Sequence, residues 1–115
     1  MIKHEFSFDA DEQNFINKVV EASNQHPIMV DFWAEWCPPC RALTPILEKL
    51  TTESEGIFHL AKVEVDDNMH LAGQYGLRGF PTVILFIDGE EKARFSGFLP
   101  ESQVGDFLAQ NGVDI

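Results

Sequence analysis

Two cysteines separated by two residues are the part of this chain with the clearest chemistry. Cys37 and Cys40 stand in the segment WCPPC, which follows an apolar run and precedes a stretch with helical spacing. Disulfide exchange needs a thiolate, and a helix N-terminus stabilises one through unpaired amides and the positive end of its dipole. Two intervening residues in a helical turn also bring the sulfurs together. The segment therefore predicts thiol–disulfide exchange, with Cys37 as the exposed nucleophile and Cys40 as the shielded resolving thiol.

Two other uses of such a pair fit the sequence less well. Zinc normally takes four ligands, but the chain has no second CxxC pair, and its histidines are scattered without ligand spacing: His4, His26, His59 and His70. We therefore expect no metal. A purely structural disulfide is also not expected, because so short a loop constrains the unfolded chain very little.

Composition limits the classes of partner. The 115 residues include 19 acidic and 8 basic side chains, a formal charge of −11 that repels phosphate backbones and anionic lipid. We therefore expect binding to neither nucleic acid nor membrane. The first residues carry no apolar signal core and no apolar run is long enough to cross a bilayer, so we expect a cytoplasmic protein. The length, a hydrophobic content of 44% and the absence of repeats predict a single domain over residues 1–115, which we expect to be monomeric.

The elements before the cysteines must place them at a strand end. Residues 6–8 alternate as in a short edge strand, and the capping-box spacing of Asp9 and Glu12 predicts a helix over residues 11–22. Residues 28–34 are apolar on both faces, as in a central strand covered by helices on both sides. Asp31 is the single exception in that strand.

The elements after the cysteines complete the predicted fold. A second helix buries its leucine-rich stripe, and Pro45 inside it is expected to kink it. There follow a strand over 57–65, a short helix over 69–75, strands over 82–87 and 92–98 joined by a DG hairpin turn, and a last helix with Val104, Phe107 and Leu108 on one face. The order βαβαββα predicts an α/β fold with a mixed central sheet and helices on both faces.

Several segments together resemble the thioredoxin family. Residues 30–40 (VDFWAEWCPPC) are similar to its active-site segment, and the likeness extends to residues 45–47, 61–63 and 75–82 (YGLRGFPT), to the DG hairpin and to Gly97. The resemblance covers nearly the whole chain and implies the thioredoxin fold. It implies a protein-disulfide reductant active in electron transport and cell redox homeostasis, with no cofactor beyond a redox-active Cys37–Cys40 disulfide. The implied partners are disulfide-containing protein substrates and a thioredoxin reductase as electron donor.

The resemblance also implies two catalytic residues besides the cysteines. Asp31 would exchange protons with Cys40, a role that suits an acid whose pKa is raised by desolvation. An edge-strand Asp facing water fits poorly with the apolar neighbours in its run. Lys62 resembles the lysine that moderates this acid; a solvated strand lysine is the alternative.

A second group of residues is implied in substrate binding. Pro81 resembles the family's cis-proline facing the cysteine pair, and only about one X–Pro bond in twenty is cis. The adjoining backbone would pair with an extended substrate segment. The resemblance places an apolar docking patch around the cysteines, formed by Trp36, Pro38, Phe80 and Gly97. Structural roles near the site fall to Trp33, Pro39 and Pro45; for Trp33, core packing and a direct contact at the site both remain open.

The chain departs from the family's pattern at two positions. Pro38 stands where a glycine is usual, which removes an amide from the helix mouth and stiffens the loop. We expect a redox potential measurably different from that of a Pro38→Gly variant, with the sign left open. Phe80 is bulkier than the family's usual aliphatic residue, which would narrow the choice of substrate.

Two alternative functions remain open at this point. The Pro-Pro loop also fits a thiol oxidant or isomerase. Residues 43–48 (LTPILE) and 74–86 are similar to the thioredoxin domain that heads certain chaperones with tetratricopeptide repeats, so the chain could be a redox-active chaperone or binding domain. The intact cysteine pair favours catalysis.

Overall fold

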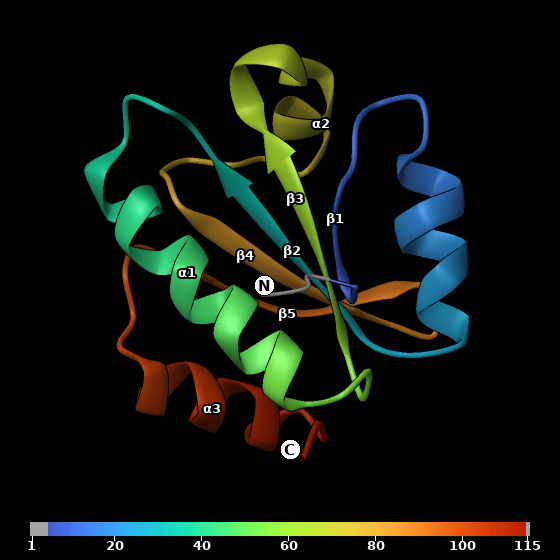
Figure 1. Cartoon of the computed structure of the whole chain (residues 1–115). Helices are drawn as coiled ribbons and strands as arrows, with labels where there is room; N and C mark the ends of the chain where they lie inside the picture. The colour runs from blue at the N-terminus through green and yellow to red at the C-terminus, as the bar shows by residue number, and fades with distance from the viewer. Residues whose placement is uncertain (1–4, 115) are drawn as a thin grey trace.

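A five-stranded mixed sheet forms the centre of the computed structural model, which describes residues 5–114 (Figure 1). The strands are β1 (Ser7–Asp9), β2 (Ile28–Trp33), β3 (His59–Glu64), β4 (Thr82–Ile87) and β5 (Glu90–Ser96). They lie in the order β1-β3-β2-β4-β5. β1, β3 and β2 are parallel, whereas β4 runs antiparallel to β2 and β5. The predicted sheet, with one parallel and one antiparallel half, is thus confirmed.

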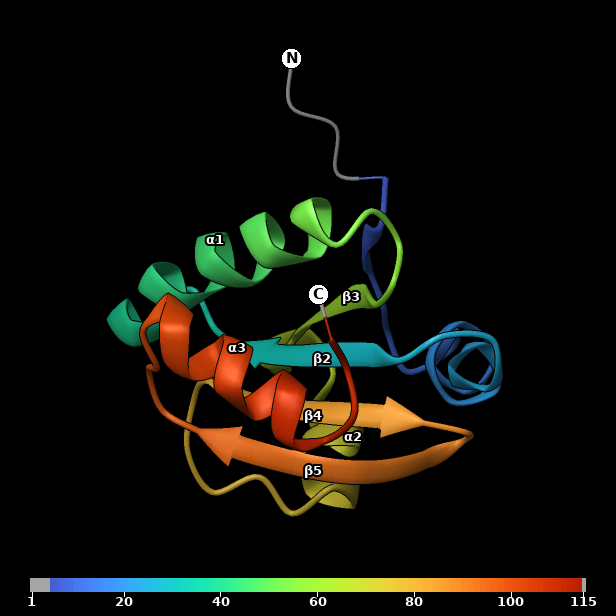
Figure 2. The ribbon, with the colours of Figure 1, turned by 90° about the horizontal axis from the view of Figure 1, so that it is seen from below.

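Helices cover both faces of this sheet (Figure 2). α1 (Pro38–Glu53) and α3 (Glu101–Gln110) lie on one face. The other face is covered by the wide helical segment η1 (Ile16–Glu21), its continuation η2 (Ala22–Asn24) and α2 (Met69–Gln74), which follows the short turn η3 (Val65–Asp67). From β2 onward the elements follow the predicted order βαβαββα, and β1 and η1 precede it. Across residues 5–114, no helix has the length and apolar character needed to cross a membrane.

The central strand β2 supplies side chains to both halves of the core. Ile28, Val30 and Phe32 belong to the apolar cluster under η1 and α2. Met29 belongs to the cluster under α1 and α3. Because alternate residues of a strand share a face, Asp31 lies on the same side as Met29. The one polar residue of β2 is therefore placed beneath α1, the helix that carries the cysteines.

The start of the first helical segment differs from the prediction. Asp11 and Asn14 cap each other, because the Asp11 N–H donates to Asn14 Oδ1 at 2.8 Å and the Asn14 N–H donates to Asp11 Oδ1 at 2.9 Å. The predicted box of Asp9 and Glu12 is wrong: Glu12 Oε2 instead accepts the N–H of His70 at 2.8 Å. The shift of the cap by two residues delays the regular helix, and η1 begins at Ile16.

Several strand boundaries also differ from the prediction. β5 begins at Glu90 rather than at residue 92, because the two-residue turn is tight enough for Ile87 and Glu90 to pair directly. Asp88 and Gly89 both have positive φ, 54° and 82°, as a two-residue hairpin turn of type I′ requires. β3 is shorter than the predicted 57–65.

Candidate active site

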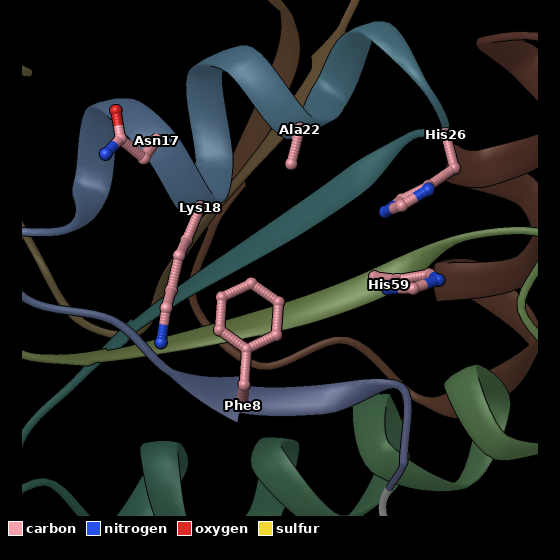
Figure 3. Close-up of a pocket in the computed structure, with 6 residues that line it drawn as sticks. All are labelled: Phe8, Asn17, Lys18, Ala22, His26 and His59. Atoms are coloured by element: carbon pink, nitrogen blue, oxygen red, sulfur yellow. The ribbon is translucent and has the colours of Figure 1, made fainter.

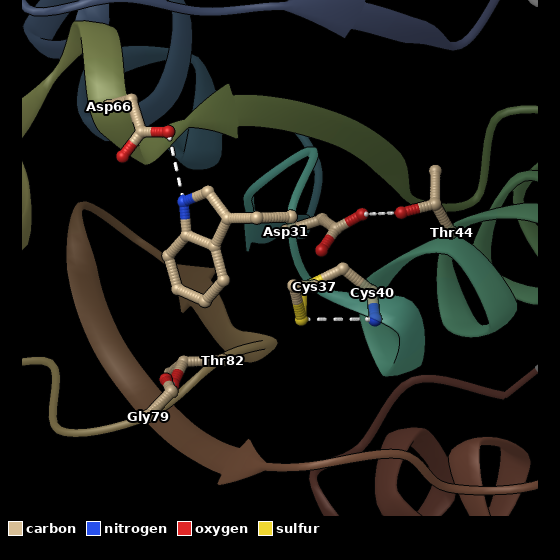
Figure 4. Close-up of a disulfide and its surroundings, with 8 residues drawn as sticks. Asp31, Cys37, Cys40, Thr44, Asp66, Gly79 and Thr82 are labelled. Carbon is tan, nitrogen blue, oxygen red and sulfur yellow. Dashed lines mark hydrogen bonds between the residues drawn. A yellow bond between two sulfur atoms is a disulfide. The ribbon is translucent and has the colours of Figure 1, made fainter.

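Cys37 and Cys40 form a disulfide at the N-terminus of α1 (Figure 4). Their Cα atoms are 5.3 Å apart. Cys37 is the extended cap residue, with φ −108° and ψ 99°. Pro38 and Pro39 fill the first two helical positions, where a missing N–H breaks no helical hydrogen bond. The N–H of Cys40 is thus the first backbone donor of α1, and it is shared between the Cys37 carbonyl at 3.1 Å and Cys37 Sγ at 3.3 Å.

Cys37 is less accessible than the sequence predicts. Cys37 is only 4% exposed and Cys40 is fully buried, so the prediction of an exposed nucleophile is wrong for this disulfide form. The bond to Cys40 holds the Cys37 sulfur against the first turn of α1. The neighbouring Trp36, by contrast, is 61% exposed. Of the two sulfurs, that of Cys37 lies in the more accessible residue, within a loop whose other side chains face solvent.

Asp31 is fully buried behind this pair, in the central strand. Its Oδ2 atom accepts a hydrogen bond from Thr44 Oγ1 at 2.6 Å, and its Oδ1 atom has no hydrogen-bond partner among residues 5–114. Burial raises the pKa of Asp31 to about 6; the Thr44 hydroxyl and the positive charge of Lys62 act in the opposite direction. An edge-strand position facing water is thereby excluded. The residue has the protonation behaviour of an acid–base group near neutral pH.

Lys62 lies directly opposite Asp31 in the parallel register of β2 and β3. Its Nζ atom is 2.8 Å from Glu48 Oε2 of α1, and both side chains are partly buried. The alternative of a fully solvated Lys62 side chain is therefore excluded. The Lys62–Glu48 pair borders a cavity of about 320 Å³ that also touches Cys40 and Thr44. Cys40 and this ion pair thus share one cavity, with Asp31 in the strand beside it.

The cis-proline segment approaches the same edge of the sheet. The Phe80–Pro81 peptide bond is cis. Thr82 pairs with Phe32 in the antiparallel register, so the start of β4 lies beside the end of β2, from which the cysteine loop departs. The N–H of Gly97, a residue with φ +88°, donates to the Pro81 carbonyl at 2.8 Å. Pro81 and Gly97 are therefore fixed together next to the cysteine loop.

An aromatic contact joins the two sides of this edge. The Trp36 and Phe80 rings meet edge to face, with 6.0 Å between their centroids. The indole N–H of Trp36 donates to Asp66 Oδ2 at 3.0 Å (Figure 4). Since Trp36 is the more exposed of the two rings, this contact forms an apolar surface beside the disulfide that is open to a partner.

Two of the residues with predicted structural roles, Trp33 and Pro45, lie at the 320 Å³ cavity. Trp33 is half-buried, packs against the core and lines the 320 Å³ cavity. α1 continues through Pro45, which lines the same cavity.

Sequence reasoning missed Thr44 and Glu48. A signal for both was present, because Cys40, Thr44 and Glu48 are four residues apart and such residues share one face of a helix.

A second cavity, of about 400 Å³, lies at the opposite end of the sheet (Figure 3). Two of the histidines that seemed scattered meet there: the rings of His26 and His59 stack with 3.6 Å between centroids. Burial lowers the pKa of both. No cluster of three or more metal-binding side chains occurs in the described part of the chain. His26 precedes β2 and Cys37 follows it, so this cavity is separate from the cysteine site.

Comparison with known proteins supports the same chemistry. A family model described as Thioredoxin matches residues 7–110. The chain is 37% identical over 97 residues to a thioredoxin of Chlorobaculum thiosulfatiphilum (84% of this chain, 88% of that protein). It is 37% identical over 100 residues to a thioredoxin of Pseudomonas aeruginosa (87% and 91%). It is 40% identical over 93 residues to the chloroplastic M-type thioredoxin of Triticum aestivum, covering 81% of this chain but about half, 52%, of the wheat protein.

Proposed function

Since the chain belongs to the thioredoxin family of dithiol–disulfide oxidoreductases, we propose that it serves as a reductant of disulfides in other proteins. The observation that carries the proposal is the Cys37–Cys40 disulfide at the N-terminus of α1, with Asp31 buried directly behind it. The electrons would be resupplied by a thioredoxin reductase. We propose a cytoplasmic location, because a reductant works in a compartment that keeps thiols reduced.

The first step of the proposed reaction uses the helix N-terminus. In the reduced protein the Cys37 thiolate attacks one sulfur of the substrate disulfide, and the other substrate sulfur leaves as a thiolate that takes a proton from solvent. A mixed disulfide between Cys37 and the substrate remains. The N–H of Cys40, which points at Cys37 Sγ, and the positive end of the α1 dipole stabilise the attacking thiolate.

The second step resolves the mixed disulfide and needs a base near Cys40. The Asp31 carboxylate accepts the Cys40 proton, and the resulting thiolate attacks Cys37 Sγ. The bond between Cys37 and the substrate breaks, so the substrate leaves with both sulfurs reduced while Cys37 and Cys40 form a disulfide. A pKa near 6 suits Asp31 to this exchange, because it can both take and release a proton near neutral pH.

The cis-proline segment limits how a substrate chain can pair with the site. Pro81 has no N–H to donate, and its carbonyl already accepts the N–H of Gly97. Pairing of an extended substrate segment therefore falls to the backbone of Phe80. The Phe80 ring, in contact with Trp36, would select apolar side chains beside the substrate disulfide.

Two measurements test the proposal: trapping of the mixed disulfide, and the reduction potential of the Cys37–Cys40 pair. A Cys40→Ser variant is expected to accumulate a mixed disulfide with a disulfide-bonded protein such as insulin, whereas a Cys37→Ser variant forms none. The reduction potential of the pair is then measured against a dithiothreitol buffer. A value below about −260 mV, under the range of the extracted cytosolic glutathione pool, supports a reductant. A value well above that range contradicts the proposed direction and indicates an oxidant or isomerase.

A further inference from the structure

Thr44 makes an unusual contact for a helical threonine. A threonine inside a helix commonly donates its hydroxyl to the carbonyl of the residue four positions earlier. Thr51, also on α1, does this: its Oγ1 atom donates to the Leu47 carbonyl at 2.7 Å. The Thr44 hydroxyl instead donates to a residue outside the helix, Asp31 in β2, with 2.6 Å between Thr44 Oγ1 and Asp31 Oδ2. This hydrogen bond ties the helix of the cysteines to the carboxyl group behind them.

The contact makes the two oxygens of Asp31 unequal. Oδ2 is held by Thr44, while Oδ1 is buried and has no hydrogen-bond partner in the described part of the chain. In Figure 4 this second oxygen lies on the side of the cysteine pair. Thr44 follows Cys40 by four residues, so the hydroxyl and the resolving thiol sit one above the other on the same face of α1.

We propose that Thr44 is a positioning residue for thiol–disulfide exchange, whose hydroxyl fixes Oδ2 of Asp31 and so leaves Oδ1 as the atom that exchanges a proton with Cys40. The proposal rests on the proposed function of Asp31 as the base for resolution. It adds a residue that acts through Asp31 and touches no substrate.

The other charged groups around Asp31 do not replace this contact. Lys62 faces it from β3 and Glu48 from α1, but these two side chains bind each other at 2.8 Å. Arg41 of α1 and Asp9 of β1 line the neighbouring cavity. Thr44 is the hydrogen-bond donor to the carboxyl group, and its hydroxyl holds the pKa of Asp31 lower than burial alone would set it. Loss of the hydroxyl is therefore expected to raise that pKa.

The test compares Thr44→Val, which keeps the shape but lacks the hydroxyl, with Thr44→Ser, which keeps the hydroxyl. The carboxyl carbon of Asp31 is titrated by NMR in the oxidised and reduced proteins, and resolution of a preformed mixed disulfide is timed across pH 5–8. We expect the valine variant to titrate at higher pH than the unaltered protein. The rise of its resolution rate with pH should move to higher pH by the same amount. The rate of resolution near pH 6 should therefore fall several-fold. The serine variant should restore both values.

The outcomes separate this proposal from the proposed function. An unchanged Asp31 titration in a folded Thr44→Val protein would overturn the positioning role, even where disulfide reduction is normal. A shifted Asp31 titration without any change in the pH dependence of resolution would also overturn it, because Thr44 would then affect the pKa of Asp31 but not the exchange reaction. If the unaltered protein reduces no disulfide, the proposed function fails, whereas the NMR titration still reports on the contact between Thr44 and Asp31. Should Thr44→Val not fold, Thr44→Ala takes its place in both measurements.

Discussion

The N–H of Cys40 points at the sulfur of Cys37 over 3.3 Å, and no backbone N–H precedes it within α1 because the first two helical residues are prolines. Thiolate stabilisation at this helix mouth therefore rests on one directed donor and the helix dipole. The positions of Pro38 and Pro39 in the first turn make the contribution of the missing donors measurable.

Replacement of Pro38 by glycine should make the cysteine pair more oxidising. The new N–H adds positive potential at the start of α1 and lowers the pKa of the Cys37 thiol, which favours the reduced form. A helix-terminus effect of about 0.3–1 kcal/mol corresponds to a shift of about 6–20 mV. Pro38→Ala is the matched control, because it restores the N–H without the flexibility of glycine. Equal potentials for all three proteins, measured against dithiothreitol, would contradict this account.

Replacement of Asp31 by asparagine should stabilise the oxidised protein at pH 7. The folded-state pKa of about 6 lies above the ordinary 3.8, so the folded protein binds more protons than the unfolded chain between these values. The contribution of Asp31 to stability therefore falls as pH rises through this window. Two pKa units correspond to a gain of about 3 kcal/mol for the variant at pH 7, which disappears below pH 4.

Denaturant unfolding at pH 4 and pH 7 measures this gain. Asp106→Asn, at an exposed position of α3, is the control and should leave stability nearly unchanged at both pH values. A gain of the same size at pH 4 and pH 7 would show that the stabilisation does not come from the buried charge.

Changes in the Lys62–Glu48 pair should move the pKa of Asp31 in opposite directions. Lys62→Gln removes a positive charge and raises that pKa further, whereas Glu48→Gln removes a negative charge and lowers it. NMR titration of the Asp31 carboxyl group in both variants measures the two shifts. Shifts of the same sign would mean that loss of the 2.8 Å ion pair moves Lys62 rather than simply changing the charge around Asp31.

The stacked imidazoles of His26 and His59 should make the protein less stable in mild acid. Burial holds both pKa values below the ordinary 6.5, so the unfolded chain takes up protons at a higher pH than the folded protein. Their contribution to stability is therefore lost as pH falls through and below 6.5. Asp31 acts in the opposite sense, so the experiment belongs in the Asp31→Asn background. There, His59→Phe should flatten the fall in stability between pH 7 and pH 5; an equally steep fall would assign it to other groups.

Loss of the Trp36 ring should affect protein substrates more than small ones. The exposed indole and Phe80 form the apolar surface beside the disulfide, and anchor aromatics of this kind contribute strongly to protein binding. For Trp36→Ala we expect about a tenfold fall in kcat/KM with a protein disulfide. A small aliphatic disulfide, which cannot cover that surface, serves as the control and should be reduced at nearly the original rate. Equal losses on both substrates would instead place the effect on the cysteines themselves.

The fold followed from the sequence because its signals are local and periodic. The apolar run of β2, the helical spacing after Cys40 and the DG turn each specify an element without reference to distant residues. The error at the first helix has the same origin. Asp9 and Asp11 both precede residues that could complete a cap, and only the tertiary hydrogen bond from His70 to Glu12 removes that side chain from the helix start.

Only part of the site could be predicted from the sequence, because its other features are contacts between residues that lie far apart along the chain. The pairing of Asp31 with Thr44 joins a strand to a helix 13 positions later, and nothing at either residue alone indicates it. His26 and His59 come together only because β2 and β3 lie side by side in register. Cys37 is buried in the disulfide form, and a list of residue types does not convey that burial.

The four-residue spacing along α1 has a consequence for engineering. Cys40 belongs to the segment that sets the redox potential, whereas Thr44 and Glu48, one and two turns further on, act on the acid in the neighbouring strand. We therefore expect substitutions at residues 38 and 39 to change mainly the reduction potential, and substitutions at residues 44 and 48 to change mainly the pKa of Asp31. A library that varies these two pairs independently would give reductants matched to a chosen buffer without altering either cysteine.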